Sequence, residues 1–271
     1  MSKSSTSPIS QIVVRIKELK AKKAERQRVG ELTKQLINIV KNPDKDAAKK
    51  ITELVKKGAD VNNFDMDKER SLLHIAAEQN RMDVVKALVE NGCKSYINVN
   101  DVYGKDPAFY AIDNNNAEML DYLLAHGIST KRPADFNLMS SYRYAVLSGN
   151  TELVKIELKH GADVNDYVGQ QFVLYDRYEK TYPGPTPLAD LVLGKDCYDP
   201  LSTRQNSKIY DEAMIKLLLD NGARTDLADP YGNTAHDSEM PEHIRKMLNA
   251  QQQKQNAVPQ NILRQAKIKS M

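Results

Sequence analysis

The sequence of 271 residues predicts an all-α repeat solenoid of about six helical pairs, carried by residues 30–249. A glycine returns at a nearly constant spacing of 34, 35, 34 and then 61 residues, at Gly58, Gly92, Gly127, Gly161 and Gly222. Sixteen residues before three of these glycines stands an alanine, which lets two helices pack closely, at Ala76, Ala111 and Ala145.

Each of these glycines follows a segment whose apolar residues recur one helical turn apart, as in Val84, Val85, Leu88 and Val89. We therefore expect a helix with one buried face before each glycine, and a positive φ at the glycine itself. Residues 151–160 depart from the pattern because Glu157 stands where the other copies have an aliphatic residue. That turn is expected either to face solvent or to pack more loosely.

Several phrases in register resemble the ankyrin repeat, with its T-P-L-H-x-A start and G-A-D-V-N exit: "SLLHIA" at 71–76, "DPAFYA" at 106–111, "TPLADL" at 186–191, "KKGADVN" at 56–62 and "HGADVN" at 160–165. The resemblance implies short β-hairpin fingers between helical pairs and a concave groove that binds partners. The copies at residues 30–58 and 231–249 match poorly, as is typical of capping repeats with solvated outer faces.

Two basic arms flank an acidic repeat domain. Residues 1–29 are expected to form a helical arm that begins near Pro8, with an apolar stripe at Ile9, Ile12, Val13, Ile16 and Leu19. We expect the stripe to pack on the first repeat; the alternative is an anchor for an anionic membrane surface or nucleic acid. Residues 250–271 are expected to form a flexible basic tail. Residues 1–30 carry a net charge of +6, residues 250–271 carry +4, and residues 31–249 carry −7.

The gap of 61 residues between Gly161 and Gly222 contains two insertions, one on each side of "TPLADL". The second is polar and is interpreted as a surface loop. The first is rich in aromatic and β-branched residues and predicts one extended hairpin finger at roughly 166–183. Its rings either bind a partner or fold back over the neighbouring repeat, and the sequence leaves both alternatives open.

Aromatic residues in the fingers and on the first helices of the pairs are the candidate partner-binding residues, because equivalent positions of stacked repeats line up. They are Phe64, Tyr103, Tyr110, Tyr144, Phe172, Tyr175, Tyr178, Tyr182 and Tyr231. Acidic residues near them favour a basic or amphipathic peptide as the ligand. These residues are Asp65, Asp67, Asp101 and Asp113.

The sequence contains no motif for catalysis, a cofactor or a metal, so no catalytic, cofactor-binding or metal-binding residue is predicted. In the motif "SLLHIA" the resemblance gives His74 a structural role, as a hydrogen-bonding residue between turns. The phrase "HDSE" at 236–239 is interpreted as a helix start, because contiguous residues of a helix point in different directions and form no triad.

These features predict a non-enzymatic protein–protein interaction module that acts as a scaffold. Two distant cysteines and the lack of a secretory signal predict an intracellular, cytoplasmic protein. Ankyrin proteins with degenerate repeats and basic arms resemble effectors that bacteria deliver into a host cell. The alternative function is an adaptor that binds an anionic membrane or nucleic acid through the arms; nucleic acid is disfavoured because no aromatic residue interrupts the basic run. The oligomeric state stays open.

Overall fold

The structure, a computed structural model, describes residues 8–65, 69–94, 97–131, 140–166, 169–170, 182–183, 186–193, 211–228, 232–237 and 239–269. It is mostly helical, and none of the described helices is long and apolar enough to cross a membrane. The chain divides into two compact units, unit 1 (Met1–Asn114) and unit 2 (Asn115–Met271). The candidate residues Phe172, Tyr175, Tyr178 and Tyr231, and the second insertion, lie outside the described residues.

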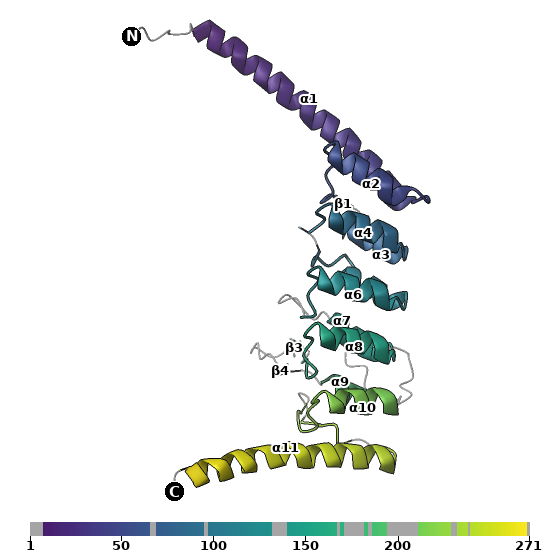
Figure 1. The fold of residues 1–271 in the computed structure, drawn as a ribbon, viewed down its shortest axis with the longest axis vertical. Helices are drawn as coiled ribbons and strands as arrows, with labels where there is room; N and C mark the ends of the chain where they lie inside the picture. Colours follow the sequence, from purple (N-terminus) through teal and green to yellow (C-terminus); the bar gives the residue numbers. More distant parts are fainter. Residues whose placement is uncertain are drawn as a thin grey trace, which may run out of the picture. The chain divides into compact units, whose positions relative to one another are not determined.

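Unit 1 consists of five helices and one small hairpin: α1 (Pro8–Lys41), α2 (Ala47–Lys56), β1 (Phe64–Asp65), β2 (Arg70–Ser71), α3 (Leu72–Glu78), α4 (Met82–Glu90) and α5 (Pro107–Asp113). The helices form two rows: α1 packs on α3 and α3 on α5 in one row. In the other row α2 packs on α4 (Figure 1). The strands β1 and β2 are antiparallel, with Phe64 opposite Ser71.

Unit 2 continues the same pattern with α6 (Ala117–Ala125), α7 (Ser141–Leu147), α8 (Thr151–Lys159), β3 (Gly169–Gln170), β4 (Tyr182–Pro183), α9 (Pro187–Leu193), α10 (Glu212–Asp220) and α11 (Glu242–Lys269). One row contains α7 and α9, and the other contains α6, α8, α10 and α11 in that order. The expected fold class, helical pairs stacked in sequence order, is confirmed within each unit.

The repeated small residues behave as the sequence predicts. All five spaced glycines have positive φ, from +89° at Gly161 to +107° at Gly127. The three close-packing alanines, Ala76, Ala111 and Ala145, are fully buried. Side chains of the residues before the helices accept hydrogen bonds from the first turn, as Asn150 does from Glu152 N and Leu153 N. Local chemistry therefore defines both ends of most short helices.

The N-terminal arm is helical, but its stripe does not pack on the first repeat. The helix α1 continues without a break across the expected boundary at residue 29, and the described stripe residues Ile12, Val13, Ile16 and Leu19 are 45–59% exposed. Among the side chains of α1 described from Ile12 onward, the first buried one is Thr33, which is 14 residues and about 21 Å of helix beyond Leu19. A continuous helix cannot fold back, so the stripe stays in solvent.

The C-terminal segment also differs from the expected flexible tail, because α11 extends across residue 249 to Lys269. Two of its glutamine side chains, Gln251 and Gln255, donate hydrogen bonds to the carbonyl oxygens of Leu219 and Ala223 at 3.1 and 2.9 Å. These carbonyls follow the end of α10 or lie in its last turn, where the helix offers them no partner. Polar residues that suggest a solvated tail thus attach α11 to the repeat.

Two further expectations are corrected. Residues 234–237 form a turn rather than a helix start, because Asp237 Oδ2 accepts hydrogen bonds from both the backbone N and the Oγ1 of Thr234, each at 2.7 Å. Glu157 is completely buried, so that turn does not face solvent. It lies one turn after Leu153 on the inner face of α8, so the helical register decides its position despite its charge.

Candidate partner-binding surface

The first finger of unit 1 is the hairpin β1–β2, which leads directly into α3. Ser71 begins α3, and its hydroxyl lies 2.7 Å from His74 Nδ1 in a capping box that satisfies the first turn. Arg70 is buried and donates to Glu78 Oε2 at 2.6 Å. These contacts hold the base of the finger against α3, while Phe64 in β1 is half-buried.

The second finger is a tight turn at residues 101–105, organised by the buried carboxylate of Asp101. Asp101 Oδ1 accepts hydrogen bonds from the backbone N of Tyr103 at 2.8 Å and of Lys105 at 3.1 Å. Its backbone N donates to Lys105 O, and its carbonyl accepts from Gly104 N, each at 2.9 Å. One aspartate therefore closes the whole turn, and Gly104 supplies the positive φ that the turn needs.

Tyr110 is a buried residue that stabilises this turn through a hydrogen bond. It is 7% exposed, and its hydroxyl donates a hydrogen bond to Asp101 Oδ2. Burial, together with the neighbouring Asp101 carboxylate, raises the pKa of the Tyr110 hydroxyl. Its placement among the groove-lining residues is thus corrected: the ring supports the finger from the inside.

His74 connects the two fingers. Its Nε2 lies 3.1 Å from Lys105 O, and its ring meets that of Tyr110 edge-on with centroids 6.3 Å apart. Burial lowers the pKa of His74 to about 4, so the ring is neutral at physiological pH. The structural role expected for His74 is confirmed by these contacts.

The tip of the second finger exposes two apolar side chains. Tyr103 is 65% exposed and Val102 is 52% exposed, on a backbone that Asp101 holds in one conformation. Tyr103 is predicted from the sequence, whereas Val102 and the anchoring role of Asp101 are not. The signal that could have found them is the spacing of Asp101 and Gly104, since an aspartate followed three residues later by glycine is typical of a tight turn.

The acidic residues expected to attract a basic peptide serve other purposes in part. Asp101 is buried in the turn, and Asp113 Oδ2 lies 2.6 Å from Lys105 Nζ. The side chains of Asp65 and Asp67 lie outside the described residues. Two of the four acidic residues thus stabilise the finger, and a preference for basic ligands loses much of its support.

The extended finger belongs to unit 2, and its base forms the expected hairpin. Gly169 pairs with Pro183 and Gln170 with Tyr182 in an antiparallel ladder. The Ser140 hydroxyl donates a hydrogen bond to Asp166 Oδ2, which ties the start of the finger to the residue before α7. The side chain of Tyr182 lies outside the described residues, and Tyr144 is half-buried on α7.

The described residues contain no group of three His, Cys, Asp or Glu side chains that could hold a metal ion. His126 Nδ1 is within 2.7 Å of Tyr122 O, and His160 Nε2 is within 2.7 Å of Asp121 Oδ1. Both histidines thus contact the same or the preceding helix in the row.

Comparison with known proteins relates the chain to repeat proteins of several organisms. A family model described as "Ankyrin repeats (3 copies)" matches residues 36–134 and 97–168. The chain is 27% identical over 198 residues to "Putative ankyrin repeat protein L371" of Acanthamoeba polyphaga mimivirus, covering 68% of this chain and 25% of that protein.

Two more relatives show the same kind of likeness. "Putative ankyrin repeat protein FPV031" of fowlpox virus is 28% identical over 151 residues, covering 55% of this chain and 41% of its own length. "Putative palmitoyltransferase ZDHHC13" of Danio rerio is 26% identical over 250 residues, covering 85% of this chain and 37% of its own length. The chain therefore spans less than half the length of each of these relatives.

Proposed function

Because the chain belongs to the ankyrin-repeat protein family, whose repeats are generally protein–protein interaction modules, we propose that it is a non-enzymatic scaffold that binds a protein or peptide on its concave groove and fingers. The observation that carries this proposal is the exposed pair Val102 and Tyr103 on a rigid turn. Tyrosine side chains offer a large contact area with little conformational freedom to lose, which makes them frequent anchors of interfaces.

Pre-organisation strengthens the case for this finger. A loop that is already ordered before binding loses less conformational entropy when it meets a partner. The turn at 101–105 is held by two backbone hydrogen bonds of Asp101, by two that its side chain accepts from backbone amides, and by the Tyr110 hydroxyl. Phe64 of the neighbouring finger adds a half-buried ring to the same unit. In unit 2, the aromatic residues of the extended finger remain candidates for a second contact, supported by the hairpin at its base.

The test compares capture of partner proteins by the wild-type chain and by the double variant Val102→Ser and Tyr103→Ala. The variant Leu147→Ser is the control, because Leu147 is an exposed apolar residue on α7, in unit 2. Quantitative mass spectrometry of proteins retained from cell lysate identifies the partner, and titration calorimetry with that purified partner measures affinity. We expect the finger variant to lose about 2 kcal/mol, roughly 30-fold in Kd. Equal affinity of the finger variant and the wild type would contradict the proposal.

We further propose an intracellular, cytoplasmic location, with action as an effector in a host cell as the finer possibility to test. The location is supported by the cysteine usage, because the chain has only two cysteines, Cys93 and Cys197, which lie far apart in the sequence. The location is checked by expressing the tagged chain in cells of its natural source and fractionating those cells. Recovery of the tagged chain in a host cell, and its loss when secretion is blocked, checks the effector role.

A further inference from the structure

The exposed stripe of α1 continues along the helix into a groove of unit 1. Residues at alternating intervals of four and three lie along one side of a helix, and here they are Ile12, Ile16, Leu19, Lys23, Arg26, Gly30, Thr33 and Ile37. We call this row the α1 seam. Eighteen residues make five helical turns, so Gly30 lies at the same angle around α1 as Ile12, and Ile37 at the same angle as Leu19.

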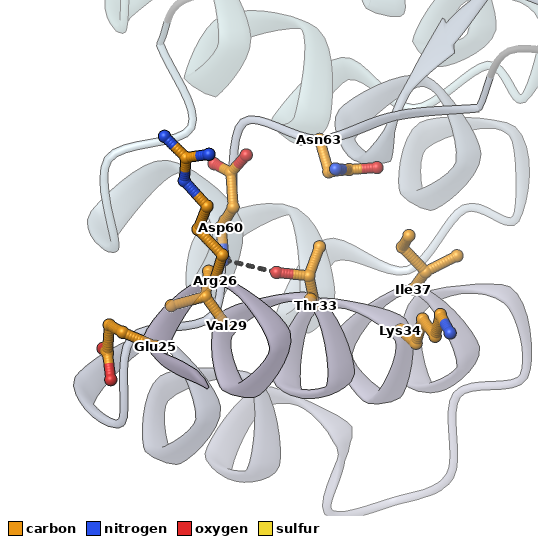
Figure 2. Close-up of a pocket in the computed structure, with 9 residues that line it drawn as sticks. Glu25, Arg26, Val29, Thr33, Lys34, Ile37, Asp60 and Asn63 are labelled. Carbon is orange, nitrogen blue, oxygen red and sulfur yellow. Dashed lines mark hydrogen bonds between the residues drawn. The ribbon is translucent and has the colours of Figure 1, made fainter. Parts of the chain in front are cut away.

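The second half of the α1 seam lines a groove of about 500 Å³. Residues 25–37 of α1, among them Glu25, Val29, Thr33 and Ile37, line one side of it, and Asp60 and Asn63 form the opposite wall, with the side chain of Arg26 rising beside Asp60 (Figure 2). The wall is fixed in place, because Asp60 N donates a hydrogen bond to Thr33 Oγ1 at 2.9 Å. A side-chain carbon added at Gly30 would meet no atom within 4 Å, so the groove is open above that residue.

The first three residues of the α1 seam are apolar and exposed. Ile12, Ile16 and Leu19 are 47–59% exposed, and together with the groove they make a face about 38 Å long from Ile12 to Ile37. A contiguous apolar stripe of this kind on a helix is typical of a surface that another element covers. The stripe and the groove therefore form one binding face.

Charge narrows the choice of the covering element. The positions that flank a heptad seam on either side carry Arg15, Lys20, Lys22 and Lys34, and the seam itself contains Lys23 and Arg26. The acidic residues of this part of α1, Glu18, Glu25 and Glu31, stand at positions away from the seam, and Glu18 and Glu25 lie against Arg15 and Arg28 at 3.3 and 2.7 Å. Every charged residue at these flanking positions is thus basic, whereas the acidic Glu25 and Asp60 line the groove half of the face.

We propose that the α1 seam docks an amphipathic helix of a partner protein, with aliphatic residues facing Ile12, Ile16 and Leu19 and acidic residues along its flanks. Such a helix, about 10–12 Å across with its side chains, is a rod that can follow the stripe and enter the groove beside Asp60 and Asn63. Acidic flanking residues pair with Lys20, Lys22 and Lys34 in the way that specifies partners of coiled coils. The surface is distinct from the finger at 101–105, so this inference does not depend on the proposed function.

Two other occupants fit the same observations less well. A second copy of the chain would bring Arg15, Lys20 and Lys22 against the same residues of its partner, and like charges across a seam repel. An anionic bilayer would match the charge, but a planar surface cannot follow the seam past the wall at Asp60 and Asn63. Both become outcomes of the experiment.

The test uses a designed probe: a labelled helical peptide of four heptads with leucine at the core positions and glutamate at the flanking positions. A second peptide with lysine at the flanking positions is its matched control. Fluorescence anisotropy with the full chain measures both at low and at physiological salt. We expect the glutamate peptide to bind at least tenfold more tightly than the lysine peptide, and its affinity to fall as salt rises.

Variants on α1 separate docking from folding. Ile16→Ser combined with Leu19→Ser should weaken the glutamate peptide at least tenfold, whereas Val14→Ser should not, because Val14 is 55% exposed on another side of the same helix. Lys20→Glu combined with Lys22→Glu should reverse the preference toward the lysine peptide. Gly30→Trp, which fills the groove, should weaken the glutamate peptide without lowering the thermal midpoint. Circular dichroism checks that each variant keeps its helix content.

Several results would overturn the proposal. One is that the glutamate peptide does not bind at about 100 μM, which is near the weak limit of specific contacts. Another is that the double variant Ile16→Ser and Leu19→Ser binds the peptide as tightly as the wild type does. Stripe-dependent binding to phosphatidylcholine vesicles with about one-third phosphatidylserine, without peptide binding, assigns the face to a membrane instead. Concentration-dependent dimers that the stripe variant abolishes assign it to a second copy. If Gly30→Trp leaves the affinity for the glutamate peptide unchanged, the stripe and the groove do not form one binding face.

Discussion

The guanidinium of Arg143 on α7 and the carboxylate of Asp190 on α9 form an ion pair in the interior of unit 2. The two side chains are 0% and 4% exposed and come from residues 47 positions apart in the chain. Arg143 occupies the position at which the repeat of α3 has His74, whose ring contacts the next finger, and at which the intervening repeat of α5 has Phe109. A different chemistry thus links successive repeats in unit 2.

Breaking this pair should destabilise unit 2 strongly. Arg143→Ala leaves Asp190 buried without its cation, and such losses cost about 3–5 kcal/mol. The double variant Arg143→Met and Asp190→Leu removes both charges and should recover most of that loss, because the desolvation cost disappears with them. Urea unfolding followed by circular dichroism measures both. A double variant as unstable as Arg143→Ala would show that packing around the two residues, and not charge, dominates.

The hydroxyl of Tyr110 should control the rigidity of the second finger. Tyr110→Phe removes the donor to Asp101 and leaves a buried carboxylate oxygen without that hydrogen bond, which costs about 1–3 kcal/mol. The backbone amides of Tyr103 and Lys105, which donate to the other oxygen of Asp101, should exchange with deuterium faster. Tyr144→Phe is the matched control, because Tyr144 is half-buried on α7 of unit 2. An unchanged exchange rate at the Tyr103 amide would show that the rigidity of the turn does not depend on the Tyr110 hydroxyl.

Two buried groups of unit 1 should oppose each other in the pH dependence of stability. The pKa of His74 is lowered by burial to about 4, from an unfolded value of 6.5, so its contribution is present above pH 6.5 and is lost as pH falls toward 4. The pKa of Asp106 is raised, chiefly by burial, to about 7 from 3.8, so its contribution is present at low pH and is lost as pH rises through 7.

The variant Asp106→Asn should remove the contribution of Asp106 and leave the opposite pH dependence of His74. Asparagine keeps an oxygen to accept from Ala108 N at the start of α5 but does not titrate in this range. Relative to wild type, the variant should therefore become less stable as pH falls from 7 to 4, by up to about 1.4 kcal/mol per pH unit. Thermal melts of both proteins at pH 7 and pH 4.5 measure the difference. A difference that does not change with pH would mean that Asp106 is ionised throughout.

Two glycines should respond oppositely to alanine. Gly92 ends α4 with φ of +94°, a conformation that costs an alanine about 1 kcal/mol or more, so Gly92→Ala should lower the thermal midpoint. Gly30 lies within α1, and an added carbon there meets no atom within 4 Å. Gly30→Ala should therefore stabilise the helix by about 1 kcal/mol. Calorimetry of the two variants beside wild type checks both signs.

The sequence by itself determined the features that depend on local physics. The period of the glycines, their positive φ, the buried alanines Ala76, Ala111 and Ala145, and the helical faces between them could all be predicted. A left-handed φ and an apolar face follow from residues within a few positions of one another, so spacing in the chain carries the information. Membership of the repeat family followed from the same regularities.

The tertiary structure decided which side chains are buried and which are free. Tyr103 and Tyr110 are both tyrosines near one finger, yet one is exposed and the other is bound to Asp101. Glu157 is buried, Arg143 finds Asp190, and the stripe of α1 lies in solvent because the helix does not turn back. The burial of a side chain depends on contacts with residues that are tens of positions away in the chain. A local sequence pattern does not specify those contacts.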